Sequence, residues 1–461
     1  MSGYKIDFNL PIHVHFIGIG GISMSGLAEV LLDRGFKVSG SDVRETNHTK
    51  KLADNGANII YKQEASNITE DIDLVVITAA IHDDNPEYME AIKKDIPVLQ
   101  RSELLGQMMD HFDVPIAIAG THGKTTTTSI ISHVLLNSHL NPTISVGGDL
   151  DLIGGNIHVG GSDIFLTEAC EYHNSFLDFN PKISVILNVD NDHLDFFGTK
   201  EKVVEAFKNF AHRLPKDGHL IINSGIKEKD EIIEDLDADV ITYGFDSSSD
   251  YSATNFMYDE NGYPSFDFVK HGMFIRRMEL SVVGLHNVSN ALVAIIIGDL
   301  LGLDGEEVAK SIKEYGGVHR RFEEKGTVNG FRVVDDYAHH PTEIGATIEA
   351  ARHVHHNELW IVFQPHTYTR TQEHFDNFVK ELSKADHVIL AEIYAARETD
   401  TLGMSSKLLS DTIKEQGTDS IYFENFKDIE DYILKNVHKG DLLITMGAGN
   451  VVTVADDLIK S

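Results

Sequence analysis

Short apolar runs alternate with segments of helical spacing along the first quarter of the chain. The runs lie at His13–Ile19, Phe36–Ser41, Asn58–Tyr61, Leu74–Ala80 and Pro97–Gln100. Helical segments are expected near 85–94 and 102–112, before and after the last of these runs. Strands that alternate with helices predict a parallel sheet covered by helices. We therefore expect a Rossmann-like first domain over residues 1–110.

The middle of the chain begins with the apolar run Pro115–Ala119, and two further apolar runs, Asp163–Glu168 and Ile183–Asp190, end in polar residues. Between Ile241 and Val283 the pattern changes to short strands with a turn at Asn261-Gly262, which predicts an antiparallel insertion of structural role. A long apolar helix follows Gly284. We expect a central P-loop-type α/β domain over residues 111–321.

A third series of strands and helices occupies the rest of the chain. Its strands are predicted at Phe331–Asp335, Leu359–Gln364, His387–Ala391, Ser420–Phe423 and Asp441–Thr445. This pattern predicts a C-terminal Rossmann-like domain over residues 322–461. The fold class is thus α/β with three domains.

One loop carries a strong chemical signal. It consists of Gly120, Thr121, His122, Gly123, Lys124, Thr125 and Thr126. The loop lies between a strand and a helix, where backbone N–H groups and the helix dipole favour a phosphate. A lysine followed by threonine adds a cation and a hydroxyl for phosphate-bound Mg²⁺. We interpret it as an ATP site, although Ile118 stands where a P-loop has glycine; the alternative is a turn that binds nothing. We expect Lys124 to be exposed.

Two polar residues follow the strands beside this loop. Glu168 and His193 come at the carboxyl ends of predicted parallel strands, which face the ligand crevice. With Thr125 they are candidate Mg²⁺ ligands, provided that phosphate oxygens and waters complete the coordination. Each could instead be an ordinary surface or turn residue.

A glycine-rich loop also follows the first strand. Gly18, Gly20 and Gly21 open a helix, and Asp42 ends the second strand, where a dinucleotide-binding fold places its ribose-binding acid. NAD is one interpretation. Ser23 replaces the third glycine of that fingerprint, so another nucleotide diphosphate is an alternative.

Composition narrows the function. A net charge of −33 opposes nucleic acids and anionic membranes, so local cations such as Arg320 and Arg321 must hold any anionic ligand. One cysteine, Cys170, excludes an intrachain disulfide, which fits a reducing cytoplasm. No apolar run indicates export or membrane insertion.

These motifs occur in one order, and together the chain resembles the Mur ligases over essentially its whole length. The motifs are His15–Gly21 with Met24-Ser25-Gly26, Gly120–Thr126, Glu168–Glu171, Asp192-His193, His286-Asn287 with Asn290, Arg320-Arg321-Phe322, Asp336–Pro341 and Gln364–Arg370. Two positions depart from the pattern. Ser23 stands where the family usually has glycine, and Thr367 stands where many relatives have arginine.

The resemblance implies an ATP-dependent ligase of peptidoglycan precursor synthesis. The family member with the most similar motifs joins L-alanine to the lactyl carboxylate of UDP-N-acetylmuramate through an acyl phosphate. The resemblance implies ATP and Mg²⁺ as cofactors and a cytoplasmic monomer or homodimer. It assigns catalysis to Lys124, Glu168, His193, Arg321 and Asp336, and further ATP contacts to Asn287 and Asn290. It assigns the substrate site to Gly18, Gly20, Gly21, Ser23, Met24, Ser25, Asp42, Tyr337, His339, His366 and Arg370.

Three alternatives remain at this point. A dehydrogenase would use the first loop and Asp42 but would leave the ATP loop unexplained. A non-catalytic ATP-binding switch would need no cluster of polar residues in the third domain. A recycling ligase, which adds a preformed peptide to the same sugar nucleotide, would carry similar N-terminal and ATP motifs.

Overall fold

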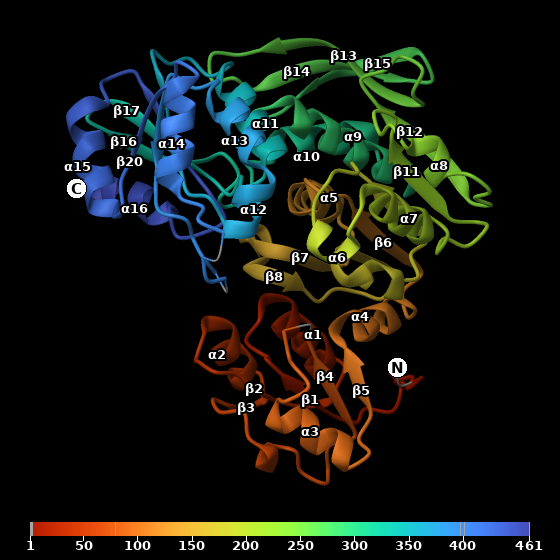
Figure 1. The fold of residues 1–461 in the computed structure, drawn as a ribbon. Coiled ribbons are helices and arrows are strands. Elements are labelled where there is room, and N and C mark those ends of the chain that lie inside the picture. Colours follow the sequence, from red (N-terminus) through yellow and green to blue (C-terminus); the bar gives the residue numbers. More distant parts are fainter. Residues whose placement is uncertain (1–2, 79, 397, 401, 461) are drawn as a thin grey trace. The chain divides into compact units, whose positions relative to one another are not determined.

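The computed structural model describes residues 3–78, 80–396, 398–400 and 402–460. Its contacts divide the chain into two compact units. Unit 1 comprises Met1–Ser252, Val269–Met273 and Asn290–Ser311, and unit 2 comprises Ala253–Phe268, Phe274–Ser289 and Ile312–Ser461. Within the described residues, three sheets follow one another from the red to the blue end of the colour scale in Figure 1. The predicted α/β class is confirmed.

The first sheet has the order β3-β2-β1-β4-β5, and all its pairs are parallel. Its strands are β1 His13–Ile17, β2 Lys37–Ser41, β3 Asn58–Ile60, β4 Leu74–Ile77 and β5 Val98–Gln100. Its helices are α1 Ile22–Asp33, α2 Asn47–Asp54, α3 Pro86–Lys93 and α4 Arg101–Met109. Every residue of β1 is buried, as expected for a parallel strand covered on both faces. The predicted strand at 74–80 is shorter, and residue 79 lies outside the described residues.

The central sheet has the order β15-β14-β13-β12-β11-β10-β6-β9-β7-β8. Its strands are β6 Val114–Ala119, β7 Thr143–Leu150, β8 Gly155–His158, β9 Ile164–Ala169, β10 Ile183–Ile186, β11 His219–Asn223, β12 Asp239–Gly244, β13 Tyr251–Tyr258, β14 Pro264–Lys270 and β15 Met273–Glu279. Its helical segments are α5 Lys124–Asn137, η3 Tyr172–Asp178, α6 Leu194–Phe197, α7 Lys200–Ala211, α8 Lys229–Ile232, α9 Leu285–Leu300 and α10 Gly305–Glu314.

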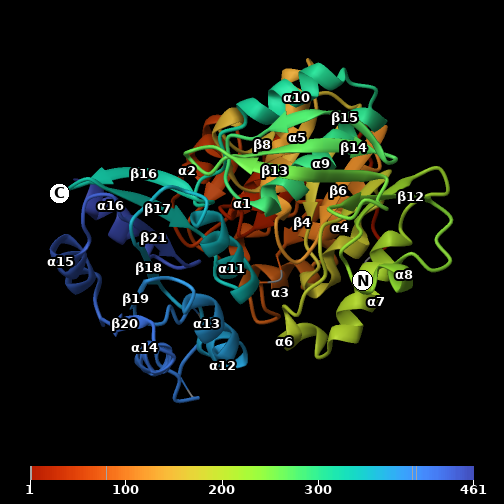
Figure 2. The same cartoon turned by 90° about the horizontal axis from the view of Figure 1, so that it is seen from above.

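The expected antiparallel insertion is only partly right. β12 pairs with β11 in parallel, and β13 pairs with β12 in parallel, so the region continues the central sheet. The hydrophobic pattern therefore changes here without a change of strand direction from β11 to β13. β13, β14 and β15 lie side by side, in green in Figure 2.

The first and central sheets of unit 1 share one hydrophobic core. The core includes Leu104, Leu105 and Met108 of α4 together with Phe176 and Phe179 from the region of η3. A Cβ added at Gly106 would lie 2.0 Å from the carbonyl oxygen of Asp178, so α4 packs almost backbone to backbone against η3. Only glycine permits this approach.

The third sheet lies in unit 2 and has the order β16-β17-β21-β18-β19-β20. Its strands are β16 Glu323–Val328, β17 Phe331–Asp336, β18 Leu359–Phe363, β19 His387–Leu390, β20 Asp419–Tyr422 and β21 Leu442–Met446. Its helices are α11 Pro341–Ala351, α12 Tyr368–Glu373, α13 Phe375–Leu382, α14 Ser406–Glu415, α15 Phe426–Asn436 and α16 Val452–Lys460. β16 is antiparallel to β17 and was not predicted, because its sequence is mostly polar.

Alternate residues of this sheet face two separate cores, as the period of a strand requires. Ile361 and Phe363 pack with α11, α13 and α14, whereas Trp360 and Val362 pack with α15 and α16. The five predicted strands of the third series are confirmed to within one residue at each end. Among the described helices, none is both long and apolar enough to span a bilayer.

Candidate active site

The predicted phosphate loop connects β6 to α5 in unit 1. Gly120 and Gly123 have φ values of 145° and 85°, which favour glycine. An ideal Cβ would lie 2.8 Å from Leu187 Cβ at Gly120 and 3.4 Å from Asn290 Oδ1 at Gly123. The backbone therefore turns tightly into α5, and this arrangement supports anion binding at the start of the helix.

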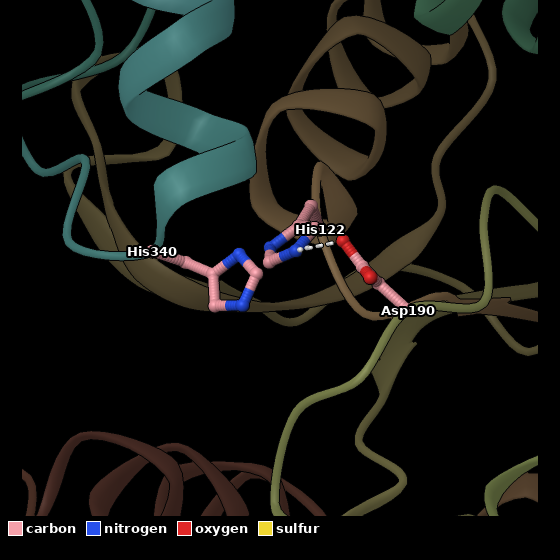
Figure 3. Close-up of side chains that lie close together, drawn as sticks. All are labelled: His122, Asp190 and His340. Atoms are coloured by element: carbon pink, nitrogen blue, oxygen red, sulfur yellow. Dashed lines mark ion pairs between the residues drawn. The ribbon is translucent and has the colours of Figure 1, made fainter. Parts of the chain in front are cut away.

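Asn188, two residues after the end of β10, fixes the loop, and sequence reasoning missed it. Its Oδ1 accepts from the His122 N–H at 2.8 Å, and its Nδ2 donates to the His122 carbonyl at 2.9 Å. Figure 3 shows that His122 also faces Asp190, with 3.5 Å between Nε2 and Oδ2. The Asp190 N–H donates to the Thr121 hydroxyl. The predicted strand over 183–190 ends at Ile186 because its last polar residues leave the sheet to hold this loop.

Lys124 is largely shielded from solvent and forms an ion pair. Its Nζ lies 2.9 Å from Glu171 Oε2, and the two side chains are 15% and 2% exposed. Burial acts to lower the pKa of Lys124, but the charges of Glu171, Cys170 and Glu168 outweigh burial and keep the pKa above its usual value. The lysine is therefore charged at any physiological pH. The expectation of an exposed lysine is wrong.

Glu168 lies at the end of β9 and contacts Thr125. Its Oε2 accepts from the Thr125 hydroxyl at 3.1 Å, and its Oε1 accepts from the Gly147 N–H at 2.6 Å. The structure thus brings together two of the three predicted metal ligands. A hydroxyl and a carboxylate are oxygen donors of the kind that Mg²⁺ prefers.

His193, the third predicted ligand, contacts Glu171. Its Nε2 lies 3.9 Å from Glu171 Oε1 and 3.9 Å from Asp192 Oδ2. Its ring packs against Tyr172, with 4.5 Å between the centroids. Glu171 Oε1 is buried and accepts no hydrogen bond from the described residues. Glu171 ends the Glu168–Glu171 motif and is not among the predicted site residues, although it contacts both Lys124 and His193.

The glycine-rich loop of the first sheet is held from β2. The Gly18 and Ile19 N–H groups donate to the Ser41 carbonyl at 2.8 and 3.0 Å. Asp42 accepts from the Gly20 N–H at 2.8 Å and from the Val43 N–H at 2.7 Å. Both carboxylate oxygens of Asp42 thus contact backbone N–H groups, and the residue shapes the loop.

Four predicted substrate residues lie at the N-cap or in the first turn of α1. Gly21 is exposed and Ser23 is half-buried. Met24 is 1% exposed and lies in the core, while the Ser25 hydroxyl donates to the Ile22 carbonyl at 2.8 Å. The Met24 side chain is therefore not available to a ligand, whereas Gly21 and Ser23 are accessible.

A buried polar cluster underlies this loop. Glu87 and His15 are both fully buried, and Glu87 Oε2 accepts from the Ser41 hydroxyl. Glu87 Oε1 accepts from Asn67 Nδ2 and lies 3.7 Å from His15 Nε2. His15 Nδ1 lies 2.9 Å from the Ser39 hydroxyl. A buried carboxylate is rare without a paired charge, so this cluster is a specific feature of the fold.

In unit 2 the paired arginines surround Tyr337. Arg320 Nε donates to Asp335 Oδ2 at 3.0 Å, whereas Arg321 Nη1 lies 3.9 Å from Glu343 Oε1. Both guanidiniums lie over the Tyr337 ring, at 4.8 and 5.4 Å from its centroid. Asp335 thus holds the Arg320 guanidinium by a hydrogen bond, whereas Arg321 has only the longer contact with Glu343.

Asp336 is buried at the end of β17. It accepts from the Phe322 N–H at 3.0 Å, the Ala338 N–H at 2.8 Å and the Thr347 hydroxyl at 3.2 Å. Burial raises the pKa of Asp336 to about 6, although the charge of Arg321 opposes this shift. These contacts position the backbone on both sides of Tyr337, so the structure gives Asp336 a positioning role within unit 2.

Three predicted substrate residues gather beside Tyr337. His339 Nδ1 lies 3.3 Å from Glu343 Oε2, and the His339 ring lies 6.1 Å from the His366 ring. Burial lowers the pKa of His366 to about 4, with help from His339 and Arg370. His366 is therefore neutral near pH 7, and its buried Nδ1 has no hydrogen-bond partner among the described residues.

The predicted ATP-contacting asparagines lie in the segment 284–290, at the start of α9. Asn290 belongs to unit 1 and Asn287 to unit 2. Asn290 lies beside Gly123, as described above, while Asn287 Nδ2 donates to the Val283 carbonyl at 2.8 Å. Nearby in unit 2, burial lowers the pKa of His286 to about 4, assisted by the charge of Arg321.

Comparison with known families covers most of the chain. Residues 13–113 match the model of the Mur ligase family, catalytic domain; residues 118–298 match the Mur ligase middle domain; and residues 320–449 match the Mur ligase, glutamate ligase domain.

Similar proteins and structures span nearly the full length. A UDP-N-acetylmuramate--L-alanine ligase of Lachnospira eligens is 54% identical over 99% of this chain and 100% of that protein. A protein of the same name from Agathobacter rectalis is 53% identical over the same shares. The crystal structure of the UDP-N-acetylmuramate-alanine ligase of Thermotoga maritima aligns with a TM-score of 0.81 at 29% identity, covering 97% of this chain and 98% of that one. A murein peptide ligase from Psychrobacter arcticus has the same fold, with a TM-score of 0.69 at 23% identity and with 97% and 98% covered.

Proposed function

Because the chain belongs to the Mur ligase family, we propose that it joins L-alanine to the lactyl carboxylate of UDP-N-acetylmuramate in a reaction driven by ATP. The observation that carries this proposal is the 54% identity to a ligase of that name over nearly the whole of both chains. The phosphate loop before α5, with a charged lysine at its end, supports the use of ATP.

The proposed reaction has two steps. A carboxylate oxygen of the substrate attacks the γ-phosphorus of ATP, the bond to the β-phosphate oxygen breaks, and ADP leaves. The amine of L-alanine then attacks the acyl carbon, phosphate leaves as the amide forms, and the amine gives up a proton. Phosphorylation is needed because oxide is a poor leaving group from a carboxylate.

Lys124 is the residue proposed to stabilise the β- and γ-phosphates during transfer. Positioned charge is the main contribution that a protein makes to phosphoryl transfer. Glu171 accepts from the lysine in the described structure, so ATP binding would give Lys124 a second anionic partner. Asn188 and the two loop glycines would keep the backbone in place.

The residues near Lys124 fit a divalent cation. Thr125 and Glu168 offer oxygen atoms beside each other, and Glu171 has a buried oxygen with no hydrogen bond from the described residues. We propose Thr125, Glu168 and His193 as the residues that would hold Mg²⁺, with Glu171 added to the set. When bound, Mg²⁺ would neutralise charge between ATP and the substrate carboxylate.

The remaining assignments follow the same proposal. Residues 1–110 are proposed to bind the UDP-sugar and residues 111–321 to bind ATP, with Arg321 at the end of that range. Residues 322–461 are proposed to contribute Asp336, Tyr337, His339, His366 and Arg370. Closure of the parts around the substrates would exclude water, which would otherwise hydrolyse the acyl phosphate. We also propose that the protein is a monomer or homodimer and that it is located in the cytoplasm.

Phosphate release tests the proposed function. The purified enzyme would receive ATP, Mg²⁺ and UDP-N-acetylmuramate together with L-alanine, glycine, L-serine or the tripeptide of a recycling ligase. We expect release to require the sugar nucleotide and to be fastest with L-alanine. Fast turnover with the tripeptide and none with L-alanine would contradict the proposal. Hydrolysis of ATP in the absence of both the sugar nucleotide and the amine would contradict it too.

A further inference from the structure

Arg101 lies at the ligand edge of the first sheet. It follows β5 directly and is the first residue of α4. All strands of this sheet are parallel, so the end of β5 lies on the same edge as the glycine-rich loop after β1. Ligands of open α/β sheets bind beyond this edge.

Arg101 also lies near the phosphate loop. Its helix packs closely against η3, which begins directly after Cys170 and Glu171. Burial lowers the pKa of Arg101, and Cys170 and Asp178 are the acidic groups near enough to oppose this shift. Cys170 in turn experiences the charges of both Lys124 and Arg101. Arg101 and Lys124 thus share Cys170 as a neighbour, which brings Arg101 toward the lysine that would hold ATP.

Among the described residues, the Arg101 side chain has no contact that explains its position. It is half-buried, and within the described part of the chain its guanidinium makes no hydrogen bond, ion pair or ring contact. By contrast, Arg34 lies 5.7 Å from the Phe8 ring centroid and 5.1 Å from that of Phe112. A guanidinium has five N–H donors, and holding them partly out of water without an acceptor is costly. An anion from outside the chain would remove this cost.

We propose that Arg101 binds the lactyl carboxylate of the sugar nucleotide and holds it toward ATP. This inference rests on the proposed function. β4 separates β5 from β1, so Arg101 lies roughly 10 Å from the loop that would take the diphosphate, at about 4.8 Å per strand. The reacting carboxylate must reach the phosphate held by Lys124, and Arg101 lies on that side. A guanidinium also binds a carboxylate with two parallel hydrogen bonds.

Paired ligands test the proposal on the full-length enzyme. UDP-N-acetylglucosamine has the same nucleotide and amino sugar as the substrate but lacks the lactyl carboxylate. By calorimetry, we expect Arg101→Met to weaken binding of UDP-N-acetylmuramate about 10- to 100-fold, as for loss of a charge-assisted contact, and to leave binding of UDP-N-acetylglucosamine unchanged. Arg101→Lys should recover part of the loss. An equal loss for both ligands, or no loss for either, would overturn the proposal.

Thermal unfolding separates binding from a structural role. Removal of an unpaired, half-buried charge should leave the melting temperature of Arg101→Met unchanged or higher. Arg34→Met is the matched control, and it should lower the melting temperature without changing the ratio of the two affinities. A lower melting temperature for Arg101→Met with an unchanged ratio would contradict the proposal. Amide formation by the wild-type enzyme tests the proposed function separately. Failure of the proposed function can therefore be told apart from failure of the role given to Arg101.

Discussion

The Nζ of Lys124 and the Oε2 of Glu171 lie 2.9 Å apart in a buried ion pair that links the phosphate loop to the end of β9. The pair holds the lysine side chain in place before ATP binds. It also means that the lysine contributes to stability as well as to catalysis, because loss of one partner leaves the other charge buried.

Lys124→Ala should abolish amide formation and also destabilise the protein. The first effect follows from loss of charge at the γ-phosphate, and the second from an unpaired Glu171, at a cost of about 3 kcal/mol. Urea unfolding and phosphate release measure the two effects. Lys124→Met combined with Glu171→Gln should recover stability but not activity. Lys182→Ala, which removes an exposed pair with Asp217, is the control and should change neither. Turnover near the wild-type rate at saturating ATP would contradict the assignment of the loop.

Glu168→Gln should lower turnover and raise the Mg²⁺ concentration needed for half-maximal rate. The substitution removes one charge at nearly constant shape, so thermal stability should change little. His193→Ala should act in the same direction. If both residues serve one site, the double variant should be much less than multiplicatively worse. Steady-state rates across a Mg²⁺ titration provide the measurement. Fully multiplicative losses with an unchanged Mg²⁺ requirement would show that these residues share no metal.

Asp336 should make the stability of the protein depend on pH between about 4 and 6. Its pKa is raised to about 6 in the folded protein, against about 3.9 when unfolded. The protonated carboxyl therefore contributes stability that is complete below about pH 4 and is lost as pH rises through about 6. Relative to Asp336→Asn, the wild-type free energy of unfolding should fall across this range by up to roughly 3 kcal/mol.

Urea unfolding of both proteins from pH 4 to pH 7 gives this difference. Asp411→Asn, at an exposed position on α14, is the control and should show no such trend. A difference that stays constant, or that grows with pH, would show that Arg321 keeps Asp336 charged throughout.

Gly106→Ala should destabilise the protein even though alanine favours a helix. Helix propensity alone predicts a gain of roughly 1 kcal/mol. The new Cβ would lie 2.0 Å from the Asp178 carbonyl oxygen, so α4 and η3 must move apart. Overpacking of this kind typically costs about 1–3 kcal/mol. Gly316→Ala is the matched control, because no atom lies within 4 Å of its Cβ position. Equal melting temperatures for the two variants would contradict the close packing.

The sequence predicts strands better than it predicts side-chain environments. Strand positions follow from apolar runs, and β17 and β18 lie where the pattern places them. The direction of β12 does not follow from its sequence, because strands with parallel neighbours and strands with antiparallel neighbours carry similar residues. Burial of Lys124 depends on Glu171, which lies 47 positions away and meets it only through the sheet. The Asn188 contact with the phosphate loop is likewise a product of strand order, which local pattern does not specify.

The cluster of His15 and Glu87 beneath the glycine-rich loop has a kinetic consequence. Neither side chain is exposed, and His15 Nε2 makes no hydrogen bond with the described residues. Solvent and small reagents can therefore reach these two side chains only when this part of the first sheet opens transiently, so their accessibility reports on how often the sheet opens.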